Sequence, residues 1–196
     1  MIGPLLAAGL GGYLLGSVPF GLLLTRLVGL GDIRAMGSGN IGATNVLRTG
    51  RKDVAALTLL LDGGKGTAAV LLAALWLGPL AALVAGVAAV LGHCTCPWLG
   101  FRGGKGVATG LGAIIGWAWP IGVGCCALWI AAAALTRRSS AAALVSFIAA
   151  PILLLLLRDQ ATALAALLVT ILVLARHHGN IRRLIAGTEP RIGAKS

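Results

Sequence analysis

Seven apolar runs, separated by short polar gaps, occupy most of this 196-residue chain. Hydrophobic residues make up 58% of it and charged residues only 11%, and the mean hydropathy is +0.97. A soluble domain carries about 25% charged residues, so a water-soluble fold could not cover this much apolar side chain. Helical runs of about 17–25 apolar residues are long enough to cross the ~30 Å hydrocarbon core of a bilayer. The sequence therefore predicts an all-α, polytopic integral membrane protein.

We expect seven transmembrane helices in a single domain that covers residues 1–196. The first run lacks the basic start of a cleaved signal peptide, so we expect it to remain as a span. Trp117-Ala118-Trp119-Pro120 predicts a tight turn after the short fourth run, and Trp76, Trp117 and Trp119 fall at outer ends of runs, where interfacial aromatic residues are common. The expected spans are 2–25, 54–77, 79–96, 106–119, 121–136, 141–157 and 160–176.

The basic residues predict the orientation of these spans. With seven spans, 14 of the 16 Lys and Arg residues fall in gaps on one side, whereas Arg158 alone falls in a gap on the other and Lys65 lies within the second run. Cytoplasmic loops carry such an excess of cations, so the N-terminus is expected outside and the C-terminus in the cytoplasm. A nucleic-acid-binding protein would spread its cations over a polar surface. The net charge of +11 therefore predicts contact with membrane lipid and no nucleic-acid partner.

Three polar stretches, at residues 37–48, 101–109 and 176–184, lie on the predicted cytoplasmic side. Gly- and Ala-rich helices pack closely, so the stretches could converge into one pocket. Glycines let backbone N–H groups approach an anion, and arginine holds phosphate through two nitrogens. The stretches therefore predict a phosphate site at the membrane surface. Its candidate donors and cations are Ser38, Thr44, Asn45, Arg48 and Lys105.

The glycine-rich segments fit two better-known phosphate motifs poorly. Residues 37–42 match G-x-G-x-x-G, but an apolar span and a charged turn precede them instead of a β-strand, so a dinucleotide fold is excluded. Residues 63–66 and 103–106 both read Gly-Gly-Lys-Gly and lack the Ser or Thr that follows the lysine of a P-loop. A flexible loop or a glycine turn beside an interfacial lysine is the plain alternative for these segments.

Asp62 and Lys65 lie three residues apart within the second run, on one face of a helix. An isolated charge there costs about 2.5–3.5 kcal/mol, so we expect a mutual ion pair that faces the bundle interior, with a direct ligand contact as the alternative. His177 and Asn180 would likewise share a helix face, and His178 would point elsewhere. Glu189 is expected to pair with a nearby arginine. The cations of a snorkelling basic helix end would be Arg176, Arg182 and Arg183.

Neither a metal nor a cofactor is expected. The four cysteines, at positions 94, 96, 125 and 126, fit no usual zinc spacing, and we expect them to pack as small apolar side chains. Five carboxylates in the whole chain make a poor magnesium site.

The polar stretches resemble those of the bacterial acyl-phosphate:glycerol-3-phosphate acyltransferases, and the resemblance covers nearly the whole length. It is carried by Gly16-Ser17-Val18-Pro19-Phe20-Gly21, S-G-N-I-G-A-T-N-x-x-R at 38–48, L-D-G-G-K-G at 61–66, G-G-K-G-V-A-T at 103–109 and R-H-x-x-N-I-x-R-L-x-x-G-x-E at 176–189. It implies a seven-helix enzyme of the bacterial inner membrane with its active site on the cytoplasmic face. Such an enzyme would move a fatty acyl group from acyl phosphate to the 1-hydroxyl of sn-glycerol 3-phosphate, giving lysophosphatidic acid and phosphate.

The resemblance also implies roles by position. Ser38 and Arg48 would act in catalysis and phosphate binding, Gly103, Gly104 and Lys105 would form the glycerol-phosphate site, and His177 and Asn180 would be a functional pair. The catalytic candidates are Ser38, Arg48, Lys105, His177 and Asn180; the substrate-binding candidates are Gly39, Asn40, Thr44, Asn45, Gly103 and Gly104; the structural candidates are Asp62, Lys65 and Glu189.

Acyl phosphate is a mixed anhydride with a good leaving group, so its reaction needs mainly positioning and charge neutralisation. Either His177 or a substrate phosphate oxygen could take the hydroxyl proton. The His-x-x-x-x-Asp pair typical of acyl-CoA-dependent acyltransferases is absent from the sequence. An organic-anion or phosphate transporter is the alternative from another class. It would show an inverted repeat, and the two halves of this chain show no such symmetry.

Overall fold

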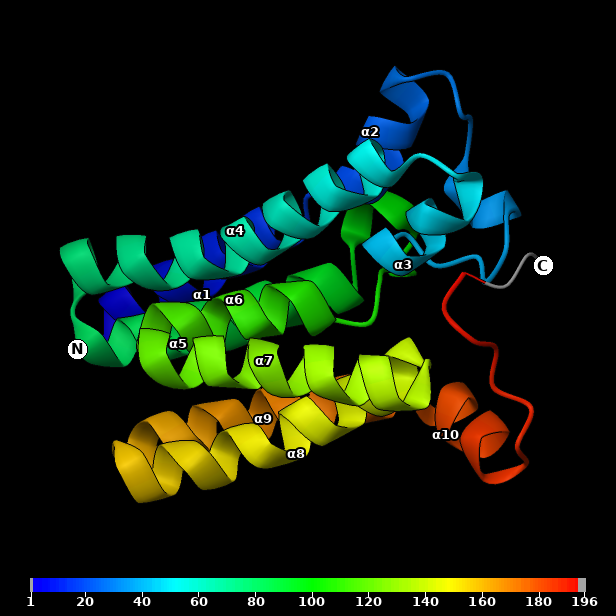
Figure 1. The fold of residues 1–196 in the computed structure, drawn as a ribbon. Coiled ribbons are helices and arrows are strands. Elements are labelled where there is room, and N and C mark those ends of the chain that lie inside the picture. Colours follow the sequence, from blue (N-terminus) through cyan, green and yellow to red (C-terminus); the bar gives the residue numbers. More distant parts are fainter. Residues whose placement is uncertain (1, 194–196) are drawn as a thin grey trace.

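The computed structural model describes residues 2–193, and these residues form an all-helical bundle (Figure 1). Three 3₁₀ turns accompany the helices, and α1 and α4 to α9 run back and forth between two ends of the bundle. The all-α prediction is confirmed. The helices are α1 (Ile2–Gly16), α2 (Phe20–Leu27), α3 (Ala43–Val46), α4 (Lys52–Leu77), α5 (Pro79–Cys94), α6 (Val107–Trp117), α7 (Trp119–Thr136), α8 (Ser139–Leu157), α9 (Gln160–Arg176) and α10 (His178–Ile185).

Most of these helices are long and apolar enough to cross a membrane. Five segments of the described chain meet this criterion alone, and α9 with α10 makes a sixth, although a 65° bend separates the two. α6 has 11 residues and, at about 1.5 Å of rise per residue, is too short to cross by itself. The chain is therefore a multi-pass membrane protein. The five segments are Ile2–Leu27, Lys52–Leu77, Pro79–Leu99, Trp119–Thr136 and Ser139–Leu157.

The first span differs from the expected continuous run of residues 2–25. It breaks at residues 17–19 into α1 and α2, because Pro19 has no N–H group to continue the helical hydrogen bonds. The Ser17 hydroxyl donates to the Leu14 carbonyl at 2.7 Å, which pairs one of the carbonyls at the break. α2 thereby leaves the direction of α1 and leads into the first polar loop (Figure 1).

α1 and α5 pack through backbone contact. A Cβ added to Gly12 would overlap the carbonyl oxygen of Ala85, and one added to Gly16 would overlap that of Ala89. Lipid tails are as apolar as leucine side chains, so helices in a membrane associate through close packing instead of apolar burial. Glycine at these two positions is therefore what allows the two helices to touch.

α4 and α6 use the same kind of contact. Gly66 of α4 lies against the carbonyl of Thr109, and Gly112 of α6 lies against the carbonyl of Gly63. Ala113 and Ile114 of α6 are fully buried. The short helix α6 is therefore enclosed by its neighbours and is an interior element of the bundle.

The tryptophans only partly follow the expectation of interfacial positions. Trp76 and Trp119 are 73% and 69% exposed, as the sequence predicts. Trp117 is wrongly predicted, because its side chain is 5% exposed and its Nε1 donates to the Ala82 carbonyl at 3.0 Å. The predicted tight turn is confirmed, since α6 ends at Trp117 and α7 begins at Trp119.

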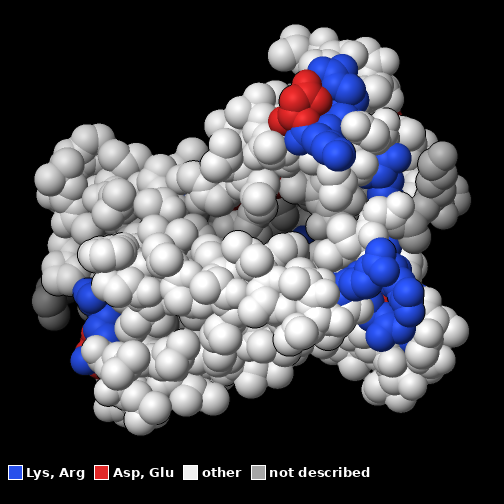
Figure 2. Space-filling model, viewed as in Figure 1, with Lys and Arg blue, Asp and Glu red and all other residues white. Residues whose placement is uncertain are grey.

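The polar stretches gather at one end of the bundle. α2, α3, the loop after α5 and α10 lie at the right-hand end in Figure 1, and the turns at residues 78, 118 and 158 lie at the other end. Figure 2 shows most of the visible Lys and Arg atoms at the loop end, a smaller charged group at the opposite end and, between them, a surface without charged residues except for a few blue atoms inside a hollow. The fold thus concentrates positive charge where the three polar stretches meet.

We predict that Gly66→Ala destabilises the protein and that Gly64→Ala does not. A Cβ at Gly66 would overlap the Thr109 carbonyl, whereas a Cβ at Gly64, on the same helix, meets nothing within 4 Å. Overpacking costs about 1–3 kcal/mol. The thermal unfolding midpoint in detergent should therefore fall for Gly66→Ala alone. Equal midpoints would show that α4 and α6 separate at no cost.

Candidate active site

Asn45 fixes the shape of the first polar loop. Its Nδ2 lies 3.0 Å from the carbonyl oxygens of Ile33 and Met36 and 2.8 Å from that of Asn40. Its Oδ1 accepts a hydrogen bond from the Ser38 N–H at 3.0 Å, and the residue is 2% exposed. The sequence places Asn45 among the substrate-binding residues, but the structure uses its whole amide group to hold the loop.

Other groups of this loop are also paired internally. The Gly39 N–H donates to the Met36 carbonyl at 2.9 Å, and the Gly42 N–H donates to Asn40 Oδ1 at 2.9 Å. Thr44 Oγ1 lies 3.2 Å from the hydroxyl of Ser139. The predicted row of glycine amides facing an anion is therefore not formed by Ser38 and Gly39, because the turn consumes both N–H groups.

Two side chains of the first stretch remain available. Within residues 2–193, neither the Ser38 hydroxyl nor the Arg48 guanidinium has a hydrogen-bond partner, and Ser38 is exposed. The Arg48 side chain lies against Gly37, where an added Cβ would be 2.9 Å from Arg48 Cδ. Gly37 also has a φ of +52°, which favours glycine. The loop thus leaves room for Arg48 and keeps its donors free.

The second stretch is held by Arg176. Its Nε donates to the Gly104 carbonyl at 3.0 Å and its Nη2 to the Gly103 carbonyl at 2.9 Å. The two glycine N–H groups donate in turn to the carbonyls of Cys94, at 3.2 Å, and His93, at 2.9 Å. The sequence predicts a snorkelling Arg176 and glycine amides free for an anion. The prediction of free glycine amides is wrong, because the end of α5 takes up both N–H groups. Arg176 lies exposed at the end of α9, and its guanidinium binds the carbonyls of this loop.

The free amides occur immediately after these glycines. Within the described chain, none of the backbone N–H groups of residues 105–109 has an acceptor. They lie at the start of α6, which Gly106 precedes in a left-handed conformation with φ +82°. Unpaired N–H groups at a helix start carry partial positive charge and attract anions. The unpaired backbone N–H groups of this region therefore lie at the beginning of α6.

Lys105 is the point where the three stretches meet electrostatically. Burial lowers its pKa from 10.5 to about 8, the Glu189 carboxylate opposes this shift, and the positive charges of Arg183, Arg48 and Arg176 add to it. Such influences require proximity. Arg48 comes from the first stretch, whereas Arg176, Arg183 and Glu189 come from the C-terminal one, so charged groups of both stretches act on this lysine of the second.

Glu189 anchors the third stretch. Its Oε1 accepts hydrogen bonds from Ser140 Oγ at 2.7 Å and Asn180 Nδ2 at 2.6 Å, and its Oε2 accepts one from Arg183 Nε at 2.7 Å. Burial would raise the pKa of this carboxyl, but the three hydrogen bonds and the Arg183 charge outweigh it, and the net shift is downward. The predicted pairing of Glu189 with an arginine is confirmed. Asn180 is drawn into the same cluster.

His177 lies at the bend between α9 and α10 and is 2% exposed. Its Nδ1 lies 2.8 Å from the Val173 carbonyl, so Nδ1 carries the proton and Nε2 keeps a lone pair. Burial lowers its pKa to about 4, although the bond to Val173 works against this. The ring is therefore neutral near pH 7. Within the described residues no hydrogen bond joins it to Ser38 or to Asn180.

A buried polar cluster lies inside the bundle. Lys65 Nζ is 2.8 Å from Asp62 Oδ1, 2.8 Å from the Val18 carbonyl and 2.9 Å from His93 Nδ1. Asp62, Lys65 and His93 are 2%, 3% and 4% exposed. The predicted ion pair is confirmed, but the contact with His93 is new. No local pattern signals it, because His93 belongs to a different helix.

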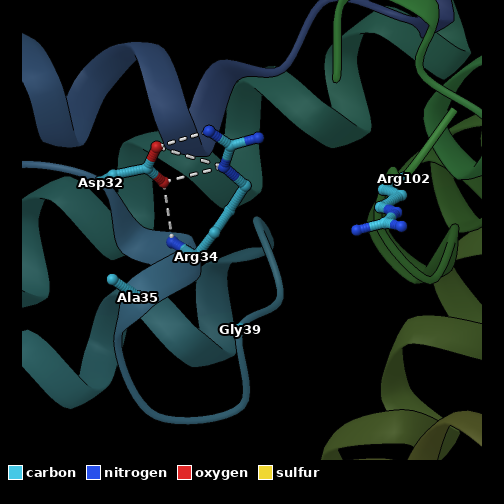
Figure 3. A pocket seen from close by; sticks show the side chains of 5 residues that line it. All are labelled: Asp32, Arg34, Ala35, Gly39 and Arg102. Carbon is cyan, nitrogen blue, oxygen red and sulfur yellow. Dashed lines mark hydrogen bonds and ion pairs between the residues drawn. The ribbon is translucent and has the colours of Figure 1, made fainter. Parts of the chain in front are cut away.

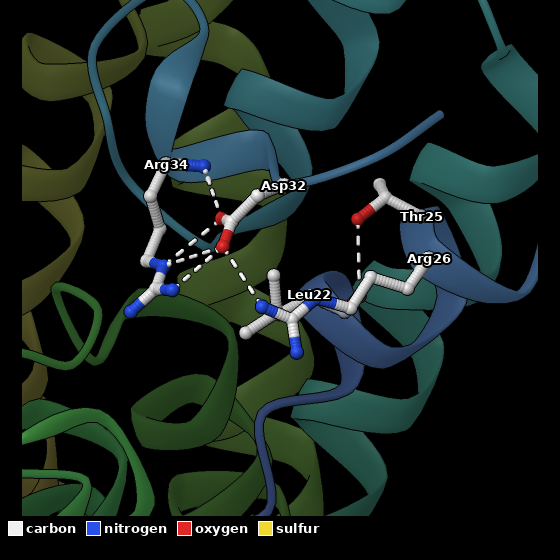
Figure 4. A network of polar contacts seen from close by, with 5 residues as sticks. All are labelled: Leu22, Thr25, Arg26, Asp32 and Arg34. Carbon is white, nitrogen blue, oxygen red and sulfur yellow. Dashed lines mark hydrogen bonds and ion pairs between the residues drawn. The ribbon is translucent and has the colours of Figure 1, made fainter. Parts of the chain in front are cut away.

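An open pocket of about 470 Å³ lies beside the first loop, between Asp32, Arg34, Ala35, Gly39 and Arg102 (Figure 3). Asp32 accepts hydrogen bonds from Arg34 Nη2 at 2.6 Å and from Arg26 Nη2 at 2.9 Å (Figure 4). The bond from Arg34 is the main reason that the pKa of Asp32 lies below its usual range. Arg102 stands on the opposite side, without a drawn partner. Two arginines and one aspartate therefore line this pocket.

Within residues 2–193, no group of three or more His, Cys, Asp and Glu side chains is placed to hold a metal ion. The four cysteines are free thiols, and all except Cys126 are buried.

A family profile described as glycerol-3-phosphate acyltransferase matches residues 6–187. The chain belongs to the glycerol-3-phosphate acyltransferase family. Curated relatives with this name include proteins of Cereibacter sphaeroides and Paramagnetospirillum magneticum, each 58% identical over 191 residues that cover 97% of this chain and 95% of the relative. A relative from Maricaulis maris is 57% identical over 190 residues, or 97% of this chain and 88% of its own.

Two crystal structures of PlsY (YgiH), an integral membrane glycerol 3-phosphate acyltransferase, have the same fold. The glycerol 3-phosphate form matches with a TM-score of 0.91 and 35% identity over 96% of each chain. The lysophosphatidic acid form matches with a TM-score of 0.89 and 34% identity, covering 95% of this chain and 94% of the other. Members of the acyltransferase family thus share this bundle at low sequence identity.

We predict that the amine of Lys105 titrates at about pH 8. Burial disfavours the ammonium form, so the charge should be complete below that pH and lost above it. Trace labelling with acetic anhydride across a pH series, followed by peptide mass spectrometry, measures the fraction of free amine, and the exposed Lys52 serves as the reference. A midpoint near 10.5 would show that Lys105 is fully hydrated.

Proposed function

We propose that this chain is an acyl-phosphate-dependent glycerol-3-phosphate 1-O-acyltransferase. It transfers a fatty acyl group to the 1-hydroxyl of sn-glycerol 3-phosphate and releases lysophosphatidic acid and phosphate. The observation that carries the proposal is the site at the start of α6, where Lys105 and the free amides of residues 105–109 stand near Arg48 and Arg176. This set of donors fits a phosphate ester. Membership in the family supports glycerol 3-phosphate as the acceptor, and the resemblance of the motifs supports acyl phosphate as the donor.

The proposed enzyme crosses the bacterial inner membrane seven times, through α1 and α4 to α9. Its N-terminus lies outside and its C-terminus lies in the cytoplasm, because cations concentrate on cytoplasmic loops. α6, which is too short to cross alone, is the interior helix of the seven, and its start lies at the cytoplasmic end. In this orientation the site opens to the cytoplasm, where a water-soluble phosphate ester can enter. The acyl chain stays at lipid level, for which the hollow between α4 and α7 near the start of α6 offers a path (Figure 2).

Charge neutralisation and positioning drive the transfer. Both substrates carry phosphate, so Lys105, Arg48 and the α6 amides offset their mutual repulsion. The acceptor hydroxyl oxygen bonds to the acyl carbonyl carbon, the bond from that carbon to the phosphate oxygen breaks, and phosphate leaves with the electron pair. A phosphate oxygen, with a second pKa of about 6, is a stronger base than His177, whose pKa is about 4. We therefore assign the hydroxyl proton to a phosphate oxygen and let His177 Nε2 accept a hydrogen bond from the acceptor.

Ser38 in this mechanism donates a hydrogen bond to a phosphate or to the developing oxyanion. A nucleophilic serine needs a base within hydrogen-bond reach, and within residues 2–193 Ser38 has none. The donor is already an activated anhydride, so an acyl-serine step would gain little. Asn180 and Glu189 hold the third stretch in place. Neither a metal nor a cofactor enters the mechanism.

The test is phosphate release by the detergent-purified protein. Palmitoyl phosphate should release phosphate only when glycerol 3-phosphate is present, and lysophosphatidic acid should appear in equal amount. Activity with acyl-CoA in place of acyl phosphate would contradict the proposed donor. Uptake of glycerol 3-phosphate into liposomes without acylation would favour a transporter.

We predict that Arg48→Lys lowers kcat/KM roughly 10- to 100-fold, because a charge-assisted hydrogen bond is worth about 1.5–3 kcal/mol and a point cation cannot replace a planar fork. Arg51→Lys is the matched control. Arg51 is exposed, and its guanidinium already pairs with Asp53 at 2.6 Å, so its exchange should leave kcat/KM unchanged. Equal turnover by the two variants would show that Arg48 contributes only diffuse potential.

A further inference from the structure

We propose that His93 is a positioning residue that sets the loop of Gly103, Gly104 and Lys105, and that Asp62 and Lys65 hold its ring in place. The inference rests on the proposed role of Lys105 in binding glycerol 3-phosphate. It extends the functional site from the membrane surface into the interior of the bundle.

The ring of His93 is held in one orientation by Lys65. An ammonium group can only donate hydrogen bonds, so His93 Nδ1 accepts from Lys65 Nζ at 2.9 Å and the ring proton lies on Nε2. The same ammonium donates to the Val18 carbonyl and contacts Asp62 Oδ1, both at 2.8 Å. Three partners from three segments thus hold Lys65, and Lys65 in turn fixes the tautomer and direction of the imidazole.

The ring of His93 lies against the loop of Gly103 and Gly104. A Cβ added to Gly104 would overlap His93 Nε2, and one added to Gly103 would overlap the His93 carbonyl oxygen. That carbonyl also accepts the Gly104 N–H at 2.9 Å. The ring and the carbonyl of His93 therefore form the floor on which both glycines lie. Any larger residue at position 104 would be pushed away from it.

Arg176 holds the same loop through its carbonyl groups. Arg176 donates to the Gly103 and Gly104 carbonyls at 2.9 and 3.0 Å. Between His93 and Arg176 the two peptide units have little freedom, and the next residue is Lys105, at the start of the free amides. The direction of the phosphate-binding groups is thus set by His93, which need not touch the substrate.

This role explains why three ionisable groups are kept inside the bundle. Buried ion pairs often contribute little net stability, and well-packed apolar residues can replace them without loss. An apolar cluster could fill the same space, but it could not fix an imidazole in one tautomer against Gly104. Displacing reacting groups by about 1 Å can lower a rate 10²-fold, so rigid support of this loop has a direct catalytic value.

The test separates positioning from stability. His93→Asn keeps a polar atom for Lys65 but removes the atoms that touch Gly104. We expect the KM for glycerol 3-phosphate to rise roughly tenfold, a change of about 1.4 kcal/mol, while the KM for acyl phosphate stays within about twofold and the thermal midpoint is retained. A loss of active protein alone would lower kcat and leave both KM values unchanged, and that result would overturn the proposal.

A second experiment holds even if His93→Asn folds poorly. Gly104→Ala should be severely impaired because its methyl group meets the ring, and adding His93→Ser should restore part of the lost kcat/KM by making room. Additive losses in the double variant would contradict the contact.

Hydrogen exchange gives a readout that does not depend on turnover. His93→Asn should speed exchange at the Gly103 and Gly104 amides without changing exchange in α7 and α8. This result would stand even if the wild-type protein showed no acyl-phosphate activity, so failure of the proposed reaction and failure of this inference are distinguishable. Unchanged exchange at both glycines would overturn the positioning role.

Discussion

Lipid offers no hydrogen bonds, so polar groups within this bundle must be satisfied by the protein itself. At the loop end of the bundle, three side chains each pair several polar groups of the polar stretches. Asn45 takes three carbonyls of the first loop, Arg176 takes two of the second, and Glu189 gathers three donors of the third. Each stretch is therefore rigid for a separate, identifiable reason.

Because most neighbouring polar groups are paired, the few groups without partners are candidates for binding a substrate. Ser38, Arg48 and the amides of residues 105–109 are unpaired within the described chain, although paired groups surround them. Arg48 and these amides lie near Lys105, whose charge is made less favourable by burial and by neighbouring arginines. In the proposed reaction, an anion that enters this region would relieve the repulsion and satisfy the donors together. Close backbone contacts at Gly66 and Gly112 bring α6 into the interior, so its start can face that anion.

The sequence predicts much of this arrangement, because hydropathy and cation spacing locate most helices and place the polar stretches at one end. The Asp62–Lys65 and Glu189–arginine pairs also follow from local spacing and the cost of a lone charge. What sequence reasoning missed depends on contacts between distant segments. Three such hydrogen bonds join residues 28 or more positions apart: Arg176 with Gly104, Trp117 with Ala82, and His93 with Lys65. The free amides after Gly104 were missed for another reason. The N–H groups of Gly103 and Gly104 look available in the sequence, but both are hydrogen-bonded in the fold, and composition does not reveal this.

In the proposed mechanism, the start of α6 binds the phosphate group of the acceptor. A structure of the protein with glycerol 3-phosphate bound would show where that phosphate lies. We expect the phosphate within hydrogen-bond reach of Lys105 Nζ and of at least one backbone N–H of residues 105–109. A phosphate lodged instead between Arg34 and Arg102, with the start of α6 unoccupied, would contradict it.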